Sequence, residues 1–480
     1  MFKQRKLWTD DEARQVHDTA LELLEKVGMQ IEEKQARVDF AKADCRVDET
    51  NERVFIPRHV VEEALLKTPA TFSMYDAFGQ RYFGVGGDET SLGTNGFCAF
   101  YVDWKTGLLK EGNYEALAEE GKLIDVLDVP NHFQTSIQPM DKPVAVQDLW
   151  MGKCGFTYTR KPIHVVPYGE LGARGLIEMA AEVVGGVDIL KEKPILSFNI
   201  CTLSPLKMRA DASEAIREAA KYKVPCLFTA GPMAGATAPV TLAGELAEAW
   251  AEVVTHIVLL QIYQPGSPAI AASWSRIMDM KQATCTVGTP EYALMRAAFT
   301  QLGRMNNIPS GGGGFLADSN TIDAQYGWEK FMTGLATMQA KQNVTLGLGM
   351  LSQLNVFSHE ALVIDCEIVQ TIRRLLQGII VDNEHIAFDL IAKEGGIGGK
   401  VAFMQSPHTR KHFKTEHMMA DLTDRRTLAT WQKDETKNDI RKRTCQKIEH
   451  CLASWDYSKG LEKEEAFDRI IEKYERLHTK

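Results

Sequence analysis

Several signatures of common protein classes are missing from this chain of 480 residues. Its nine cysteines are an odd number, scattered without any CxxC pair, so no disulfide framework is expected and a reducing compartment fits. There is no GxxxxGK(S/T) loop, and no strand followed by GxGxxG with an acid downstream, which counts against nucleotide binding. A Ser–His–Asp order, paired carboxylates for acid–base work and HExxH are also absent.

Excess positive charge and a membrane-spanning run are lacking too. The net charge of −9 argues against a broad nucleic-acid surface. The most apolar long stretch, residues 242–263, is broken by acidic residues and a histidine, so it predicts a core helix rather than a membrane span. The first residues include no apolar run typical of a signal peptide, so we expect a cytoplasmic protein. A content of 44% hydrophobic and 25% charged residues indicates a globular fold with a sizeable core.

The first part of the chain predicts helices followed by short antiparallel strands. Residues 9–27 begin with Thr9 as an N-cap and then repeat apolar residues at helical spacing. Further helices are expected near 33–42 and after Pro57. Residues 71–112 are rich in aromatic, β-branched and glycine residues, which favours antiparallel strands. We assign residues 1–128 to this N-terminal region.

From about residue 130, short apolar strands alternate with long amphipathic helices. Five of the strands are introduced by a proline, which costs no interior ladder hydrogen bond at the first position of a strand. These prolines are Pro162, Pro194, Pro225, Pro268 and Pro309. Two more strands are expected at 132–139 and 344–352, and the intervening helices at 208–222, 241–262, 290–306, 323–341 and 358–377.

Repeated β/α steps of about 30 to 45 residues are typical of βα units. The predicted fold is therefore α/β, a TIM (β/α)8-type barrel over residues 129–383, and a doubly wound open sheet is the alternative. Residues 378–383 are the candidate eighth strand. The charged, helical residues 384–480 predict a C-terminal extension packed on the barrel, and a homo-oligomer is expected because such a tail can also form an interface.

The run PSGGGGFLAD at 309–318 places four glycines, Gly311, Gly312, Gly313 and Gly314, at the end of a predicted barrel strand. In barrel enzymes the active site forms at that end of the strands, and glycine in a strand often marks the close approach of a ligand. Other strand ends, such as 229–235 and 346–349, are also small. We therefore predict a wide mouth, with a tightly packed small-residue barrel as the alternative.

Polar and aromatic residues near the same strand ends are the candidates for binding a substrate. Aromatic faces with few charges suit a cation, each ring contributing about 0.5–2 kcal/mol. The aromatic candidates are Phe97, Tyr101, Tyr168, Trp274 and Phe357, and the polar candidates are Asn95, His164, Asn199 and Gln353. Each residue taken alone is also compatible with ordinary core packing.

Several segments resemble the trimethylamine methyltransferase family of corrinoid-dependent methyltransferases. They include "GTNGFCAFYVDWKTGLLKEG", "GGGGFLADSNTIDAQYGWEK", "LGLGMLSQLNVFSHEALVIDCEI" and "SPHTRKHFKTEHMMADLTDRRTLATW", and the resemblance covers nearly the whole chain. It implies a TIM barrel that moves a methyl group from a methylated amine to the Co(I) of a corrinoid carried by a separate protein. The chain lacks a DxHxxG motif, so it should not bind its own corrinoid tightly.

The resemblance also suggests the type of substrate. Trimethylamine-specific members carry a pyrrolysine at a position that falls at about Met350 here, and this chain resembles the branch without it. That branch implies a quaternary amine, with glycine betaine preferred and proline betaine, carnitine or γ-butyrobetaine as alternatives. Direct displacement at an N-methyl carbon then needs no covalent catalytic residue and no bound metal. Gly311–Gly314, Gly347 and Met350 would line the approach of the corrinoid.

Two other functions remain open from the sequence. A TIM-barrel enzyme acting on a small metabolite without a corrinoid would need a general base or metal set, for which only His164 and Asp318 stand out. A non-catalytic betaine-binding protein would usually be exported and two-lobed, whereas this chain predicts one barrel.

Overall fold

The computed structural model describes residues 6–434 and 439–478, and eight parallel strands form its central sheet. In spatial order, which is also chain order, the strands are β6 (Ser91–Gly93), β9 (Phe133–Gln134), β10 (Ile163–Val165), β11 (Leu196–Cys201), β13 (Cys226–Ala230), β15 (Ala269–Ser273), β18 (Ser310–Gly313) and β19 (Val344–Leu346). A parallel bridge between Gly93 and His132 joins the two edges. The sheet is thus closed into the predicted TIM-type barrel, and the open sheet is excluded.

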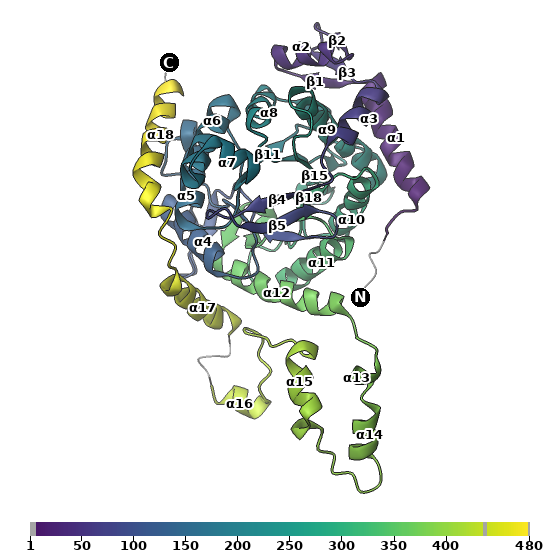
Figure 1. Cartoon of the computed structure of the whole chain (residues 1–480), viewed down its shortest axis with the longest axis vertical. Helices are drawn as coiled ribbons and strands as arrows, with labels where there is room; N and C mark the ends of the chain where they lie inside the picture. The colour runs from purple at the N-terminus through teal and green to yellow at the C-terminus, as the bar shows by residue number, and fades with distance from the viewer. Residues whose placement is uncertain (1–5, 435–438, 479–480) are drawn as a thin grey trace.

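A helix follows each barrel strand and covers the outside of the sheet (Figure 1). These helices are α4 (Tyr114–Val126), α5 (Gln147–Tyr158), α6 (Gly169–Val184), α8 (Ala210–Tyr222), α9 (Leu242–Tyr263), α10 (Pro290–Met305), α11 (Ala324–Ala340) and α12 (His359–Gln377). A short helix, α7 (Val187–Glu192), follows α6. The five predicted helices correspond to α8–α12. By length and composition α9 alone among described helices could cross a membrane, but 89% of its most apolar 18-residue window is buried, as in a core helix.

The prolines before five barrel strands lie where the sequence predicts them, at the strand starts. Each precedes its strand by one or two residues, so no N–H is missing from the ladder. Their carbonyl groups still accept hydrogen bonds from the adjacent strand: Phe133 N–H donates to Pro162 O at 3.0 Å, and Phe198 N–H to Pro225 O at 2.9 Å.

The eighth strand is not where the sequence suggested. Residues 378–381 follow α12 without strand structure, so that candidate is wrong. The strand is β6, within a stretch predicted as antiparallel and assigned to the N-terminal region; the barrel therefore begins before residue 129. Only three residues long and followed by a turn, β6 has no apolar run that could reveal it. Its neighbours do pair antiparallel: β4 (Thr71–Tyr75) with β5 (Arg81–Gly86), and β7 (Phe100–Val102) with β8 (Leu109–Glu111).

The first N-terminal elements cover one side of the barrel. They are α1 (Asp10–Lys26), β1 (Met29–Ile31), α2 (Lys34–Lys42), β2 (Arg46–Asp48), β3 (Arg53–Phe55) and α3 (Arg58–Lys67). The β4–β5 hairpin lies across the strand starts, because Tyr75 N–H donates to Pro194 O and Ala77 N–H donates to Arg160 O.

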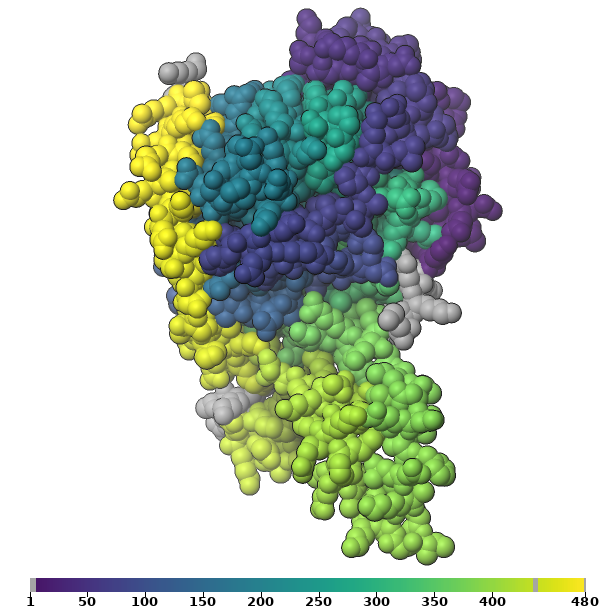
Figure 2. All heavy atoms as spheres, viewed as in Figure 1, coloured from purple at the N-terminus to yellow at the C-terminus, as the bar shows by residue number. Residues whose placement is uncertain are grey.

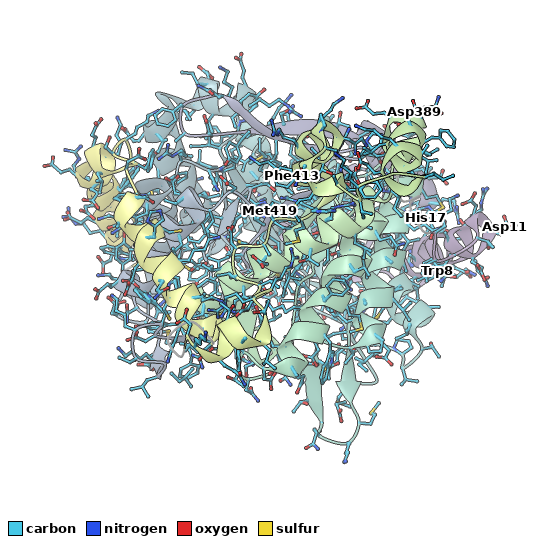
Figure 3. The ribbon with its side chains drawn as sticks, turned by 90° about the horizontal axis from the view of Figure 1, so that it is seen from below. Trp8, Asp11, His17, Asp389, Phe413 and Met419 are labelled. Atoms are coloured by element: carbon cyan, nitrogen blue, oxygen red, sulfur yellow. The ribbon has the colours of Figure 1, made fainter. Side chains whose placement is uncertain are left out.

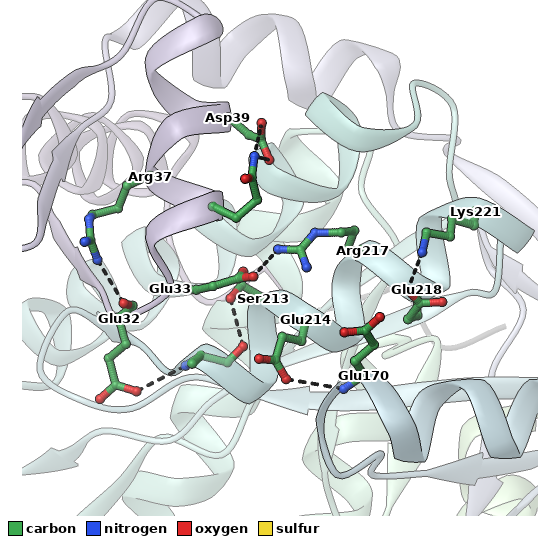
Figure 4. Close-up of polar contacts among 12 residues, drawn as sticks. Glu32, Glu33, Arg37, Asp39, Glu170, Ser213, Glu214, Arg217, Glu218 and Lys221 are labelled. Carbon is green, nitrogen blue, oxygen red and sulfur yellow. Dashed lines mark hydrogen bonds and ion pairs between the residues drawn. The ribbon is translucent and has the colours of Figure 1, made fainter. Parts of the chain in front are cut away.

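Ion pairs and hydrogen bonds fasten α2 and the segment before it to the barrel (Figure 4). Arg217 of α8 pairs with Glu33, and the backbone N–H of Ala210 donates to Glu32 at 3.1 Å. On α1, His17 accepts a hydrogen bond from Trp250 Nε1 of α9 at 2.9 Å. The N-terminal region is therefore part of the same packed unit as the barrel.

Further short strands and turns lie at the carboxyl ends of the barrel strands. They are β12 (Lys207–Met208), β14 (Met233–Ala234), β16 (Arg276–Asp279), β17 (Thr284–Thr286), β20 (Met350–Leu351) and β21 (Val356–Ser358). The first pairs with β1, the next three form one small sheet, and the last two join β7 and β8.

The C-terminal extension divides into a packed part and a projecting part. Helices α17 (Ile440–Ser454) and α18 (Glu464–His478) lie on the barrel: Arg441 pairs with Glu360 at 2.9 Å, and Tyr474 donates to Glu178 at 2.7 Å. Residues 379–434, called the arm below, project away from it (Figures 1 and 2). The arm contains α13 (Asn383–Ile386), α14 (Phe388–Gly395), α15 (Pro407–Glu416) and α16 (Leu428–Gln432). The extension thus packs on the barrel through α17, α18 and the last part of the arm, where Glu367 of α12 accepts the N–H groups of Asp421, Leu422 and Thr423. The rest of the arm does not follow the expectation.

Candidate active site

A cavity of about 380 Å³ opens at the carboxyl ends of the barrel strands. Its walls come from the ends of β6, β9, β10, β11, β13 and β15 and the turns that follow them. No Asp, Glu, His or Lys lines it, and Arg276 is its one charged residue among those described. This location is where TIM-barrel enzymes place their active sites.

Four of the predicted binding residues meet in this cavity: Asn95, Phe97, Asn199 and Trp274. They come from three separate barrel strands, β6, β11 and β15, and each lies at or just after its strand end. The shared position at parallel strand ends is what brings residues so far apart in sequence together.

Phe97 is held in a conformation that favours glycine. Its φ is +76°, in the left-handed region, and its side chain is 36% exposed at the cavity. A bulky residue in this region costs on the order of 1–3 kcal/mol, and such outliers cluster at functional sites. Hydrogen bonds around it fix the turn, since Cys98 N–H donates to Ser136 O and Gln138 N–H donates to Cys98 O.

Trp274 is the second aromatic residue that lines the cavity, and a glycine makes room for it. Its backbone N–H donates to Ala230 O at 2.6 Å, and only 7% of the residue is exposed. A Cβ at Gly313 would lie 2.6 Å from Trp274 Cζ3 and would collide with the Tyr292 hydroxyl. Gly313 therefore seats the indole ring and helix α10 against the strand.

Asn199 contributes an oriented amide. The Thr229 hydroxyl donates to Asn199 Oδ1 at 2.7 Å, and both residues line the cavity. Because the oxygen is occupied in this way, the amide nitrogen of Asn199 is left as a hydrogen-bond donor at the cavity wall.

Five predicted binding residues lie outside the cavity: Tyr101, His164, Tyr168, Gln353 and Phe357. Tyr101 and Phe357 are buried on β7 and β21, where both rings meet His359 edge-on. Tyr168 precedes α6, and Gln353 lies in the turn between β20 and β21. Aromatic and polar side chains that follow a strand end can turn toward a covering helix or loop instead of the mouth.

His164 lies deep inside the barrel rather than at its mouth. It is fully buried, its Nδ1 is hydrogen-bonded to the Ser197 hydroxyl, and its ring centroid is 4.4 Å from that of His132. Burial lowers the pKa of His164 to about 3, so the ring is neutral at pH 7. His164 is therefore a core residue, the alternative that the sequence left open for each candidate.

The glycine run is closed, not open. Gly311–Gly314 are buried, and a Cβ at Gly311 or Gly314 would lie 2.7 Å from Leu227 Cδ1 or Thr345 Cγ2. Gly347 has φ +142° against the Gly314 carbonyl, and Met350 is buried, with its sulfur near Cys98. None of these six residues lines the cavity. The contacts of the glycines fit the alternative, close packing of strands and helices, and the glycine-walled approach of a corrinoid stays a prediction.

Arg276, which was not among the residues predicted from the sequence, lines the cavity two residues beyond Trp274. It begins β16, which continues directly from the turn after β15. The signal was available, because a residue immediately after a barrel strand's carboxyl end belongs to the mouth.

Two larger hollows, each of about 660 Å³, lie on the outer surface. One is between the C-terminal half of α12, residues 126–129 and the arm, and the other between α2, α3 and α9. Neither includes a barrel strand end, so we assign the substrate site to the smaller cavity at the mouth.

Fold and cavity define the class of protein: a TIM-barrel enzyme with its small-molecule site at the carboxyl ends of the strands. Its family follows from the sequence. The profile of "Trimethylamine methyltransferase (MTTB)" matches residues 1–474; the chain belongs to this family and is a methyltransferase.

Individual relatives differ in the substrate that their names state. A trimethylamine methyltransferase MttB of Desulfitobacterium hafniense is 31% identical over 424 residues, covering 88% of this chain and 85% of that protein. A glycine betaine methyltransferase from another strain of that species is 32% identical over 437 residues, covering 89% of each. The solved structure of the hydroxylamine complex of MtmB has a TM-score of 0.50 at 11% identity, covering 93% of this chain and 95% of that one, and so shares the fold.

Proposed function

We propose that this enzyme transfers a methyl group from a quaternary amine, with glycine betaine as the preferred substrate, to the Co(I) of a corrinoid carried by a separate protein. Proline betaine, carnitine and γ-butyrobetaine are the other substrates of this type. The reaction is assigned to the cytoplasm.

The observation that carries this proposal is a cavity lined by two aromatic residues and by no Asp, Glu, His or Lys among the described residues. Phe97 and Trp274 offer ring faces to an ammonium group. In the displacement, the methyl–nitrogen bond breaks with its electron pair left on nitrogen, while the acceptor's electron pair forms the new bond to carbon. The amine departs neutral, so no residue has to donate or remove a proton.

Two further observations agree with a quaternary amine. The position that carries pyrrolysine in trimethylamine-specific relatives falls at about Met350, a buried methionine without reactive chemistry for activating an amine. A relative named glycine betaine methyltransferase is as similar to this chain as one named for trimethylamine.

The rim of the cavity suits a protein that presents the methyl acceptor. Loops that follow three different barrel strands expose apolar side chains there, namely Leu203, Val240 and Met280. Met280 packs against Gly235, which joins two of these loops at the rim. Such an apolar rim around a cavity is typical of a protein-binding surface.

The alternative, a corrinoid-independent barrel enzyme, is less well supported by the residues. It would need a general base or a ligand set for a metal, yet His164 is buried below the cavity and Asp318 does not line it. Asp318 instead accepts the Val287 N–H at 2.7 Å.

The test is an anaerobic methyl-transfer assay with free cob(I)alamin and a panel of the four quaternary amines and trimethylamine. We expect loss of the Co(I) absorption and formation of methylcobalamin with a quaternary amine, and none with trimethylamine. If no member of the panel reacts, either with cob(I)alamin or with a corrinoid protein from the same genome, the proposal fails.

A further inference from the structure

The cavity proposed to hold a cation is lined by a cation of its own. The Arg276 guanidinium donates from Nη1 to Trp274 O at 3.3 Å, a long hydrogen bond, and its buried Nε has no partner among the described residues. Within residues 6–434 and 439–478, Arg276 forms no ion pair with an acidic side chain. Its charge is therefore not neutralised by a contact of its own.

The groups behind Arg276 do not supply the missing negative charge. Glu245 accepts the backbone N–H of Arg276 at 2.9 Å and forms no ion pair with its guanidinium among the described residues, and burial raises the pKa of this carboxyl to about 8. A second guanidinium, that of Arg296, is fully buried nearby and donates to Ser273 and Ser275 at 3.0 and 2.9 Å. This wall of the cavity is positive.

A positive wall repels a substrate that is only a cation. The same wall attracts a carboxylate, and Arg–carboxylate pairs out of bulk water are among the stronger polar contacts. The amide nitrogen of Asn199 is a second donor in the same cavity. A ligand with an ammonium group and a carboxylate can satisfy both the aromatic walls and these donors.

We propose that Arg276 is the specificity-determining residue of this site: with Asn199 it binds the carboxylate of a zwitterionic substrate and excludes quaternary amines that lack an acid. The inference rests on the proposed function. It adds the residue that separates betaines from simple cations, a separation that aromatic walls cannot make.

The first experiment measures binding without any corrinoid, by titration calorimetry with glycine betaine and with choline. These ligands share the trimethylammonium group, and a hydroxyl replaces the carboxylate in choline. The wild type should bind glycine betaine at least about 10-fold more tightly. In Arg276→Gln the affinity for glycine betaine should fall about 10- to 100-fold, as for loss of a charged hydrogen bond, while that for choline stays equal or rises.

Two further variants separate this role from a structural one. Arg276→Lys keeps the charge and should retain a preference for glycine betaine. Arg209→Gln removes a nearby guanidinium that is paired with Asp211 on the surface, and should change neither affinity. Circular dichroism checks that each variant is folded. The inference is overturned if Arg276→Gln lowers the affinities for glycine betaine and choline equally, or lowers neither.

Methyl transfer by the wild type separates failure of the inference from failure of the proposed function. Equal rates with choline and glycine betaine would leave the function standing and overturn the role of Arg276. Absence of transfer from every amine, together with Arg276-dependent binding of glycine betaine, would overturn the methyl transfer and leave the carboxylate site standing.

Discussion

At the scale of the residue, Phe97 has a backbone conformation that a bulky side chain disfavours, and this conformation places its ring at the cavity. A ring at the mouth is kept at φ +76° although glycine would fit that backbone without strain. At this position a glycine would favour stability, whereas the phenylalanine ring favours substrate binding.

Replacement of Phe97 by glycine separates these two demands. We expect Phe97→Gly to change the free energy of unfolding by no more than about 1 kcal/mol, since relief of the strained φ offsets the flexibility gained by the unfolded chain. Affinity for the quaternary amine should fall about 2- to 30-fold with the loss of one ring face. Urea unfolding and calorimetry measure the two quantities, and Phe97→Ala, which loses the ring but keeps the strain, is the matched control. Wild-type affinity in both variants would remove Phe97 from the site.

At the scale of the element, helix α4 supports the mouth through a buried acid. Glu120 is fully buried, and its Oε2 accepts the N–H groups of Ser136 and Ile137 in the segment after β9. Its Oε1 has no partner among the described residues, and burial raises the pKa of Glu120 to about 8. The carboxyl is therefore mainly protonated in the folded protein at pH 7.

This raised pKa predicts a pH dependence of stability. Between its ordinary pKa of 4.5 and about 8, the folded protein keeps a proton that the unfolded chain has lost. The contribution of Glu120 to the free energy of unfolding is therefore fully present below about pH 4.5 and is lost as the pH rises toward 8. From about pH 5.5 to 8.5, the wild type should lose about 2–3 kcal/mol relative to Glu120→Gln, whose side chain does not titrate. Urea unfolding of both proteins at the two pH values tests this, and parallel curves would contradict it.

The elements also show what the sequence could and could not predict. Seven barrel strands were predictable because proline or a turn bounded each apolar run, and five outer helices because their apolar spacing was regular. The strand Ser91–Gly93 was not, since its pairing with β19 depends on barrel closure, which no local pattern records. At the site, position along a strand predicted Asn199 and Trp274, but the direction of Tyr101 and His164 depended on packing that the sequence does not show.

At the scale of the whole molecule, the arm projects from the barrel, to which residues 416–423 are hydrogen-bonded through α12. It exposes large apolar side chains along its length, and Ile397 and Met404 are almost fully exposed. Met419 is also exposed, and Figure 3 views the arm from below with Asp389, Phe413 and Met419 on it. An apolar surface of this extent on a projecting segment predicts that a partner covers it.

The partner we expect is a second copy of the chain. The arm continues from the end of α12, whose C-terminal half borders residues 126–129, the segment before barrel strand β9. It thus begins at the amino-terminal end of the barrel, whereas a protein that delivers a methyl acceptor must reach the mouth at the other end.

Sedimentation should show self-association of the wild type and a monomer for Ile397→Asp combined with Met404→Asp. Leu66→Asp, at an equally exposed apolar position on α3, should keep the wild-type mass. Because the arm lies away from the cavity, the double variant should still transfer methyl groups to free cob(I)alamin; a monomeric wild type, or a double variant of unchanged mass, would contradict this assembly.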